Sequence, residues 1–419
     1  MYGLIGKNLS HSFSKEIHES FGNKEYELIS TKNIGEIIDS KNLLGFNVTI
    51  PYKTEIMKFI NKFDPIALKT NSVNTVVLKE NEYYGYNTDY YGFLELIKFY
   101  QVDIEGKNIL ILGNGSVSNT IVLALNELNA KSIVRLCRNK KYPEDDLYQN
   151  LNKYHYYDII INTTPVGMHP NNTDELLIEL DCFTKLSLVI DLIYNPLRTK
   201  LLLEAEKRNI KVINGLYMLV MQAKKAHELF FNCDLPINLA NKIFKKLLKK
   251  MYNFVFIGMP LSGKSKYAKF FSDNLTKKLY DTDQEIEDIL GCTIFDYFQS
   301  HSEEEFRMFE IEIIKMLYKN HNSIISTGGG AIKKYINIDL LKQNGIIIFL
   351  NKNPEEIAEK NIQGRPLIKS KEDVLRIAQE RLPIYEKACD ISIAITRDTV
   401  YHINEIKEKI DEYLNSQWS

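Results

Sequence analysis

The sequence has few of the features that mark secreted, zinc-binding or membrane-spanning proteins. Its five cysteines are scattered with no C-x-x-C pair, and no H-E-x-x-H motif occurs among its eight histidines. This argues against a disulfide framework or a structural zinc site and favours a reducing compartment. No apolar run approaches ~18 residues, and the N-terminus resembles a short strand rather than a signal peptide. We therefore expect a cytoplasmic protein without a membrane span.

An excess of charge of one sign is also lacking. With 53 Lys and Arg against 54 Asp and Glu, the net charge is -1, so no overall field attracts nucleic acid or membrane. The basic run at 245–250 is either a nucleic-acid patch or, as we favour, the last turn of a helix, where cations complement the dipole. The chain of 419 residues is too long for one core and predicts two or three domains.

Residues 253–265, NFVFIGMPLSGKS, form the most specific local motif. An apolar run at 254–257 predicts a buried strand and residues 266–275 have helical spacing, so G-x-x-x-x-G-K-S lies between a strand and a helix. In such a P-loop, backbone N–H groups and the helix N-terminus hold phosphates. Lys264 would reach the outer phosphates and the Ser265 hydroxyl would ligate Mg²⁺. The alternative is a chance glycine turn, which the flanking strand and helix disfavour.

Expected strands and helices alternate along the preceding residues, which predicts parallel sheets in α/β domains. In the first unit, 1–103, hydroxyl side chains at 10, 12 and 14 precede a helix expected from Lys15. One hydroxyl suffices as an N-cap, which leaves the others for a polyhydroxylated ligand. Lys53 follows a strand that stops at Pro51, where a lone lysine is usually solvated. Asp89 precedes a helix expected over 90–99, and its simplest role is an N-cap.

The second unit begins near residue 105 with a strand at 107–112, the loop GNGSVS (113–118) and a helix at 119–128. This is G-x-G-x-x-S, a dinucleotide fingerprint with Ser118 in the place of the third glycine. The next strand, 132–136, ends in CRNKK (137–141), with cations and no acid. That composition favours the 2′-phosphate of NADP over the ribose of NAD.

Beyond the P-loop, Asp281 and Asp283 are expected at a strand end, on the same side of the strand. One would hold Mg²⁺ through water and the other would receive a substrate hydroxyl; the alternative is a solvated loop. The run EEFRMFE (304–310) lies in an expected helix, where such charges are usually a solvated face. Three glycines at 328–330 indicate close approach to the backbone.

Residues 1 to about 249 resemble shikimate dehydrogenase. The matching runs are SHSFS (10–14), NVTIPYK (47–53), SVNT (72–75), NTD (87–89), the glycine loop, NTTPVGM (162–168) and GLYMLVMQA (215–223). The resemblance implies reduction of 3-dehydroshikimate by NADPH, with Lys53 and Asp89 as the catalytic pair. It implies substrate binding by Ser12, Ser14, Thr49, Asn74, Asp89, Tyr194 and Gln222. It implies cofactor binding by Gly113, Asn114, Gly115, Ser116, Ser118, Arg138 and Gly215. The chain differs from the family at 137–139, where Asn-Arg-Thr is frequent, and at 116–117.

Residues 251 to about 415 resemble shikimate kinase through the P-loop, LYDTD (279–283), GGGA (328–331), GRPL (364–367) and ERLPIY (380–385). The resemblance implies phosphorylation of shikimate by ATP, with Lys264 and Asp283 catalytic and Mg²⁺ at Ser265 and Asp281. It implies ATP binding by Gly258, Gly263, Lys264, Ser265, Lys266 and, on a lid, Arg365. It implies shikimate binding by Asp283, Arg307, Gly329, Gly330 and Arg381; two arginines suit a carboxylate. Leu261 stands where the family's loop often carries glycine.

We therefore expect an α/β fusion enzyme with a two-lobed dehydrogenase followed by a P-loop kinase. The expected domains are a substrate lobe at 1–104 plus 217–249, a Rossmann lobe at 105–216 and a kinase at 251–419. NADPH, ATP and Mg²⁺ are the expected cofactors, small molecules are the expected partners, and the protein would be a monomer or homodimer. Two alternatives remain: a quinate/shikimate dehydrogenase that uses NAD, fused to the kinase, or a nucleotide-sensing protein with inactive sites.

Overall fold

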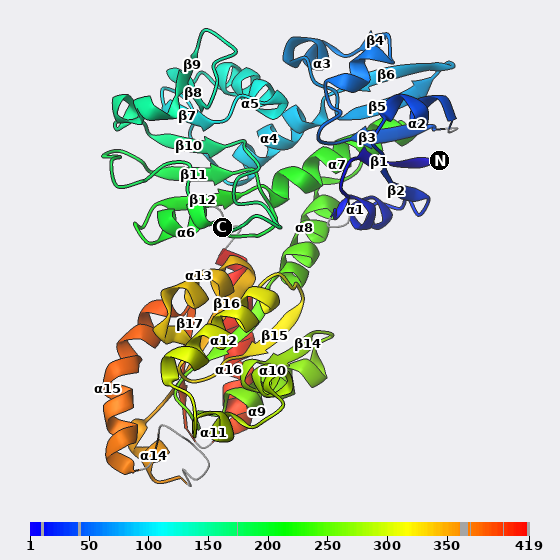
Figure 1. The fold of residues 1–419 in the computed structure, drawn as a ribbon. Helices are drawn as coiled ribbons and strands as arrows, with labels where there is room; N and C mark the ends of the chain where they lie inside the picture. The colour runs from blue at the N-terminus through cyan, green and yellow to red at the C-terminus, as the bar shows by residue number, and fades with distance from the viewer. Residues whose placement is uncertain are drawn as a thin grey trace. The chain divides into compact units, whose positions relative to one another are not determined.

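The computed structural model describes residues 1–9, 12–40, 43–173, 175–360, 368, 370–396 and 398–416. The chain divides into two compact units, one of Met1–Tyr194 with Glu204–Leu247 and one of Asn195–Leu203 with Leu248–Ser419. Both units combine helices with sheets that contain parallel strands, which confirms the expected α/β class (Figure 1). Within the described ranges, no helix has the length and apolarity needed to cross a membrane.

The first sheet of the first unit is mixed, and the expectation of parallel sheets throughout is wrong here. Its strand order is β2-β1-β3-β5-β6-β4, and β5 runs antiparallel to both of its neighbours. The short connection between β5 and β6 permits only an antiparallel pair. The strands are β1 (Tyr2–Gly6), β2 (Tyr26–Ser30), β3 (Gly45–Val48), β4 (Lys62–Phe63), β5 (Thr75–Lys79) and β6 (Glu82–Tyr86). The helices between them are α1 (Ser14–Ser20), α2 (Ile34–Ser40), the 3₁₀ turn Glu55–Lys58 and α3 (Pro65–Thr70).

The second sheet is parallel throughout, in the order β12-β11-β10-β7-β8-β9. Its central strands are almost continuous runs of buried isoleucine, leucine and valine, as expected for a sheet covered on both faces. The strands are β7 (Asn108–Leu112), β8 (Ser132–Cys137), β9 (Asp145–Leu147), β10 (Ile159–Asn162), β11 (Leu188–Asp191) and β12 (Lys211–Asn214). The helical segments are α4 (Thr88–Phe99), α5 (Ser116–Glu127), the 3₁₀ turn Tyr148–Tyr154, α6 (Lys200–Glu206), α7 (Leu216–Phe231) and α8 (Ile237–Met251).

The second unit has one parallel sheet in the order β14-β15-β13-β16-β17, with the strand of the P-loop motif at its centre. The strands are β13 (Asn253–Ile257), β14 (Lys278–Asp281), β15 (Ser323–Ser326), β16 (Gly345–Lys352) and β17 (Ile391–Ile395). The helices are α9 (Lys264–Asn274), α10 (Thr282–Leu290), α11 (Ile294–Tyr297), α12 (Glu303–Leu317), α13 (Tyr335–Asn344), α14 (Pro354–Ala358), α15 (Lys371–Ala388), α16 (Thr399–Ser416) and the 3₁₀ turn Ala331–Lys333.

Segment Asn195–Leu203 belongs to this second unit and is held there by Arg198. The buried Arg198 guanidinium donates to the carbonyl of Lys342 at 2.8 Å and lies 3.0 Å from Asp390 Oδ1. Asp390 Oδ2 in turn accepts the backbone N–H of Ile347 at 2.8 Å. Burial tends to raise the pKa of Asp390, but the charge and hydrogen bonds of Arg198 outweigh it and hold that pKa below its usual range.

Candidate active sites

Lys53 and Asp89 come together at the start of α4. Lys53 Nζ lies 2.5 Å from Asp89 Oδ2, and the two side chains are 12% and 10% exposed. Asp89 is not the N-cap of α4, as its position before the helix had suggested. Asn87 occupies the cap position, and Asp89 sits in the first helical turn, where a carboxylate is stabilised by the helix dipole. The pair is therefore a mostly buried ion pair rather than a capping residue and a solvated lysine.

Asn74 joins this pair to α7. Its Nδ2 donates to Asp89 Oδ1 at 3.0 Å and to Gln222 Oε1 at 3.3 Å. Asn74 and Gln222 are 148 positions apart in the sequence, so only the tertiary fold brings them together. Four residues expected at the dehydrogenase site, Lys53, Asn74, Asp89 and Gln222, thus form one connected polar cluster.

The remaining residues expected to bind the substrate lie at the start of α1 and shortly after β3 and β11. Ser12 Oγ is 3.1 Å from Ser14 Oγ and accepts the backbone N–H of Ser14 at 3.2 Å. Thr49 follows β3 and donates its backbone N–H to Ile5 of β1 at 2.9 Å. Tyr194 follows β11, its ring meets Phe13 edge to face, and burial raises its pKa to about 12. Ser10 and His11 of the same motif fall outside the described residues.

The glycine loop follows β7 and leads into α5. Gly113 has φ +98°, a conformation that side chains disfavour, and Gly115 precedes the first residue of the helix, Ser116. The buried Ser118 hydroxyl donates to the Gly115 carbonyl at 2.7 Å, so this substitute for the third glycine also closes the first turn. Gly215, at the start of α7, is packed so closely that a Cβ would lie 2.0 Å from the Leu192 carbonyl oxygen.

The basic turn after β8 is more constrained than the sequence suggested. Lys140 Nζ lies 3.0 Å from Asp146 Oδ1, whereas Arg138 is exposed. The adjoining β9 also brings the buried Asp145 to the glycine loop, where its Oδ2 accepts from Asn114 Nδ2 at 2.8 Å. The buried Arg135 lies 2.8 Å from Asp145 Oδ1 and compensates its charge. Asp145 was not predicted from the sequence, because it follows the basic turn along the chain and only the short strand β9 places it beside the glycine loop.

The P-loop motif has the conformation expected of it. Gly258 and Gly263 have φ +148° and +104°, and α9 starts at Lys264. Lys264 Nζ donates to the carbonyls of Gly258 and Met259, both at 3.0 Å. The Lys264 side chain therefore folds back towards the loop backbone and lies in the concavity where a P-loop holds phosphate. Lys266 points elsewhere and donates to Thr399 Oγ1 at 2.9 Å.

Leu261, where related loops often have glycine, adopts the left-handed conformation with φ +66°. This region is unfavourable for leucine because its Cβ crowds the backbone. Two contacts compensate: the side chain packs against the core of the unit, and Lys360 Nζ donates to the Leu261 carbonyl at 2.8 Å. The loop therefore keeps its glycine-like backbone despite the substitution.

Ser265 and Asp281 converge beside the loop, with Ser265 Oγ donating to Asp281 Oδ2 at 2.8 Å. A hydroxyl and a carboxylate are oxygen donors of the kind Mg²⁺ binds together with phosphates and water, so these residues fit the ion. In the described part of the chain, no group of three or more His, Cys, Asp or Glu side chains is placed to hold a metal.

The prediction that Asp281 and Asp283 lie on the same side of a strand is wrong. Strand β14 ends at Asp281, which caps α10 by accepting the Asp283 N–H at 3.1 Å.

Asp283, Arg307 and Arg381 line one cavity of about 90 Å³ together with the three glycines. Arg307 is buried, within 2.8 Å of Glu310 and 3.1 Å of Glu303, and a Cβ on Gly330 would clash with its guanidinium. Arg381 Nη1 donates to the Gly329 carbonyl at 3.0 Å. The expectation of a solvated face at 304–310 is wrong for Arg307 and Glu310, which lie on the inward side of α12. Arg365 lies outside the described residues.

Burial raises the pKa of Glu310 to about 7, although the Arg307 guanidinium opposes the shift. The carboxylate is fully buried, and its Oε1 lies close to Gly328. Sequence reasoning missed Glu310; its spacing of three residues from Arg307 on one helix was the available signal.

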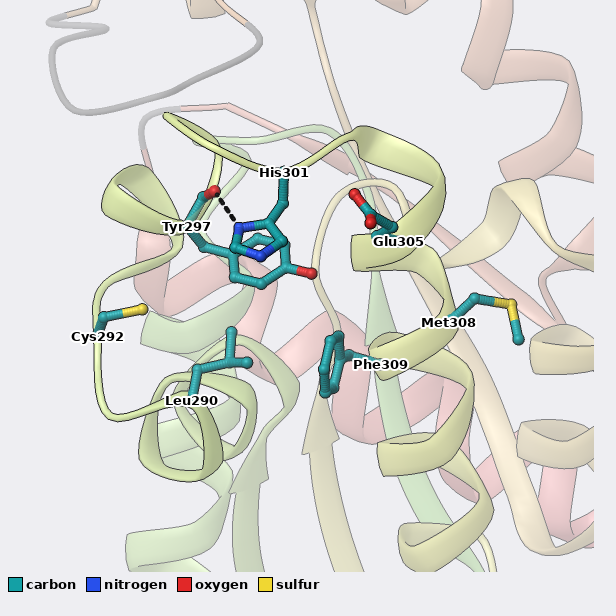
Figure 2. A pocket seen from close by; sticks show the side chains of 7 residues that line it. All are labelled: Leu290, Cys292, Tyr297, His301, Glu305, Met308 and Phe309. Atoms are coloured by element: carbon teal, nitrogen blue, oxygen red, sulfur yellow. Dashed lines mark hydrogen bonds between the residues drawn. The ribbon is translucent and has the colours of Figure 1, made fainter.

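A larger hollow of about 560 Å³ lies beside α11 and carries none of the expected groups. Its lining residues are Leu290, Cys292, Tyr297, His301, Glu305, Met308 and Phe309. Figure 2 shows the Tyr297 and His301 rings face to face, with centroids 4.1 Å apart. This lining includes no arginine or lysine, so the smaller cavity with two arginines is the better candidate for an anionic substrate.

Comparison with known proteins agrees with the family expected for each half of the chain. Residues 4–76 match the family model "Shikimate dehydrogenase substrate binding domain", and residues 260–414 match the model "Shikimate kinase". The shikimate dehydrogenase (NADP(+)) of Clostridium perfringens is 35% identical over 266 residues, which are 59% of this chain and 98% of that protein.

Solved structures show the same relationship for the dehydrogenase part of the chain. A chorismate mutase/shikimate 5-dehydrogenase fusion protein from Clostridium acetobutylicum is 33% identical with a TM-score of 0.55, covering 59% of this chain and 96% of that one. Shikimate 5-dehydrogenase from Listeria monocytogenes, solved with shikimate and NAD, is 28% identical with a TM-score of 0.51, covering 58% of this chain and 95% of that one. The chain belongs to the shikimate dehydrogenase family and carries a shikimate kinase domain after the dehydrogenase, a fusion of two shikimate-pathway enzymes.

Proposed function

We propose that the first unit reduces 3-dehydroshikimate to shikimate with NADPH and that the second phosphorylates shikimate at its 3-hydroxyl with MgATP. The observation that carries the first assignment is the shielded Lys53–Asp89 pair within the Asn74–Gln222 cluster. The P-loop beside a cavity with Asp283, Arg307 and Arg381 carries the second.

In the reductase, a ketone that accepts hydride becomes an alkoxide and needs a proton donor beside it. The Lys53 ammonium supplies that proton, and the Asp89 carboxylate keeps the ammonium oriented. Ser12, Ser14, Thr49, Asn74, Tyr194 and Gln222 would bind the hydroxyl and carboxylate groups of the substrate. NADPH, when bound, supplies the hydride. Gly113, Asn114, Gly115, Ser116, Ser118, Arg138 and Gly215 would hold it.

In the kinase, Lys264 would hold the transferred phosphoryl group and Asp283 would receive the proton of the attacking hydroxyl. Arg307 and Arg381 would bind the carboxylate of shikimate, with Gly329 and Gly330 allowing its close approach. Mg²⁺, when bound at Ser265 and Asp281, offsets phosphate charge. Each half therefore has its own full set of chemical groups, and we propose that the two reactions proceed independently.

The test uses the full-length chain with 3-dehydroshikimate, NADPH, ATP and Mg²⁺. Lys53→Ala should abolish reduction and leave phosphorylation of added shikimate within about twofold, since independent sites behave additively. Lys264→Ala should accumulate shikimate without phosphorylating it. A mixture of the two variants should restore the full conversion; if it does not while each variant retains its single step, the reactions are not independent. Absence of either step in the unmodified chain would refute that assignment.

A further inference from the structure

Behind the Lys53–Asp89 pair lies a group of uncharged polar side chains that the proposed chemistry does not use. Tyr26, Asn47 and Thr75 are buried on β2, β3 and β5 of the mixed sheet, and they lead towards Asn74. Burial of this many polar groups is costly unless each finds a partner. Their hydrogen bonds form one connected chain, and the direction of the bonds made by Tyr26 and Asn47 can be assigned.

Asn47 is fixed from both sides. Tyr26 Oη donates to Asn47 Oδ1 at 2.7 Å, and Asn47 Nδ2 donates to Thr75 Oγ1 at 2.9 Å and to the Asn74 carbonyl at 3.2 Å. An amide nitrogen has two protons, so both are used. The opposite orientation of the amide would place Oδ1 against the Asn74 carbonyl oxygen, which cannot donate. The Tyr26 ring is itself held in place by stacking on His18, with centroids 4.1 Å apart.

The hydroxyl of Thr75 connects Asn47 to Asn74 and helps to fix the orientation of the Asn74 amide. Because Thr75 Oγ1 accepts from Asn47, it can donate its own proton to Asn74 Oδ1 at 3.2 Å or to Thr88 Oγ1 at 3.1 Å. In the second case Thr88 Oγ1 can donate to Asn74 Oδ1 at 3.2 Å, so a hydroxyl proton reaches Asn74 Oδ1 by either route. Asn74 Oδ1 also accepts the backbone N–H of Thr88 at 2.7 Å. With Oδ1 occupied by two donors, Asn74 Nδ2 must face Asp89 and Gln222.

We propose that Asn47 and Thr75 are positioning residues of the dehydrogenase. They set the orientation of Asn74, and Asn74 in turn holds the carboxylate that orients Lys53. Neither residue needs to touch the substrate or the cofactor. The inference rests on the proposed function of the Lys53–Asp89 pair and adds to it the residues that keep the pair aligned.

The test compares Thr75→Val, which removes the hydroxyl and keeps the shape, with Thr75→Ser, which keeps the hydroxyl. Both are assayed in the full-length chain for shikimate oxidation by NADP⁺. Loss of one ordered buried hydrogen bond corresponds to roughly a tenfold fall in kcat/KM for shikimate in Thr75→Val. We expect kcat to fall and the KM for shikimate to rise, with the KM for NADP⁺ within about twofold of its original value. Thr75→Ser should stay within about twofold of the unmodified enzyme.

Tyr26→Phe removes only the hydroxyl that donates to Asn47, so it should lower kcat and raise the KM for shikimate by smaller factors than Thr75→Val. It also keeps the proposal testable if Thr75→Val does not fold. Ser132→Ala, which removes a hydroxyl bonded to Tyr157 at 2.9 Å on the Rossmann sheet, should leave the KM for shikimate unchanged. The inference is overturned if Thr75→Val and Tyr26→Phe leave kcat/KM unchanged, or if they lower only the active fraction while both KM values stay constant. Lys53→Ala distinguishes failure of the proposed function from failure of the positioning role. If Lys53→Ala stays active, the proposed chemistry is wrong. If it is inactive while a folded Thr75→Val enzyme is unaffected, only the positioning role is wrong.

Discussion

Lys53 and Asp89 form an ion pair of 2.5 Å in which both side chains are mostly buried. The Asp89 carboxylate is shared, with Oδ2 facing Lys53 and Oδ1 accepting from Asn74. An ammonium held this way has its nitrogen fixed beside Asp89 and keeps further N–H donors. One of these can supply the proton that reduction of a ketone requires.

Replacement of Lys53 by Ala should lower kcat for shikimate oxidation by roughly 10²–10⁴, the range contributed by a positioned acid or base. Binding of NADPH should be retained, because the residues proposed to hold the cofactor follow strands of the second sheet. Stopped-flow or steady-state rates give kcat, and fluorescence titration gives the NADPH affinity. Asp89→Asn, which keeps the shape and removes the charge, is the matched variant and should also lose rate. Near-normal kcat in Lys53→Ala would exclude Lys53 from the chemistry.

Replacement of Arg138 by Ala should raise the KM for NADPH and leave NADH use nearly unchanged. Loss of one charge-assisted hydrogen bond to a phosphate costs about 1.5–3 kcal/mol, or roughly 10- to 150-fold in affinity. Lys140→Ala is the control, because this lysine already pairs with Asp146 and should matter less. Initial rates over a range of each cofactor measure the effect. Equal damage with NADPH and NADH would argue against a 2′-phosphate site at Arg138.

Binding of shikimate to the kinase should take up protons near neutral pH. Glu310, whose pKa is raised to about 7 by burial, gains its negative charge as pH rises through that value. A bound carboxylate at Arg307 adds a nearby negative charge and raises this pKa further, so binding favours the protonated form and weakens as pH rises above about 7.

Calorimetric titration of shikimate at pH 7.5 in buffers of different ionisation enthalpy would measure that proton uptake. Glu310→Gln should lose the buffer dependence. Glu304→Gln, which alters an exposed glutamate paired with Lys334, should retain it. Identical enthalpies in all buffers for the unmodified chain would contradict the linkage.

Replacement of Arg198 by Met should destabilise the second unit. The change removes the nearer of the two cations beside the buried Asp390 and leaves only Lys342, at 3.9 Å. Breaking a buried ion pair costs up to about 3–5 kcal/mol. Kinase activity should therefore be lost at a lower temperature than in the unmodified chain, as measured by residual activity after heating. Lys249→Ala removes an exposed pair with Asp411 in the same unit and should cost less than about 1 kcal/mol. Unchanged heat resistance in the Arg198 variant would show that the pair contributes nothing to stability.

Much of the candidate sites could be predicted from short sequence runs because their chemistry is local. A P-loop needs glycines, a lysine and a hydroxyl at set spacing between a strand and a helix, and these residues lie within a few positions of one another. Lys264 and Ser265 were found in this way, and the glycine loop of the dehydrogenase likewise. Two of the predictions that failed used local rules for residues at element boundaries: Asp89 is not a cap, and Asp283 is on a helix.

The amino-acid sequence by itself therefore determined the fold class and the two enzyme families, and it located most residues of the candidate sites. The tertiary structure alone decided which groups are withdrawn from water and how they are oriented. Compensation of Asp145 on β9 by Arg135 on β8 and the support of Leu261 by Lys360 join separate elements. Glu310 is on the same helix as Arg307, and the packing of α12 in the tertiary structure buries it. Charge state and hydrogen-bond direction depend on the surroundings of a side chain, and those surroundings are assembled from residues as far apart in the sequence as Asn74 and Gln222.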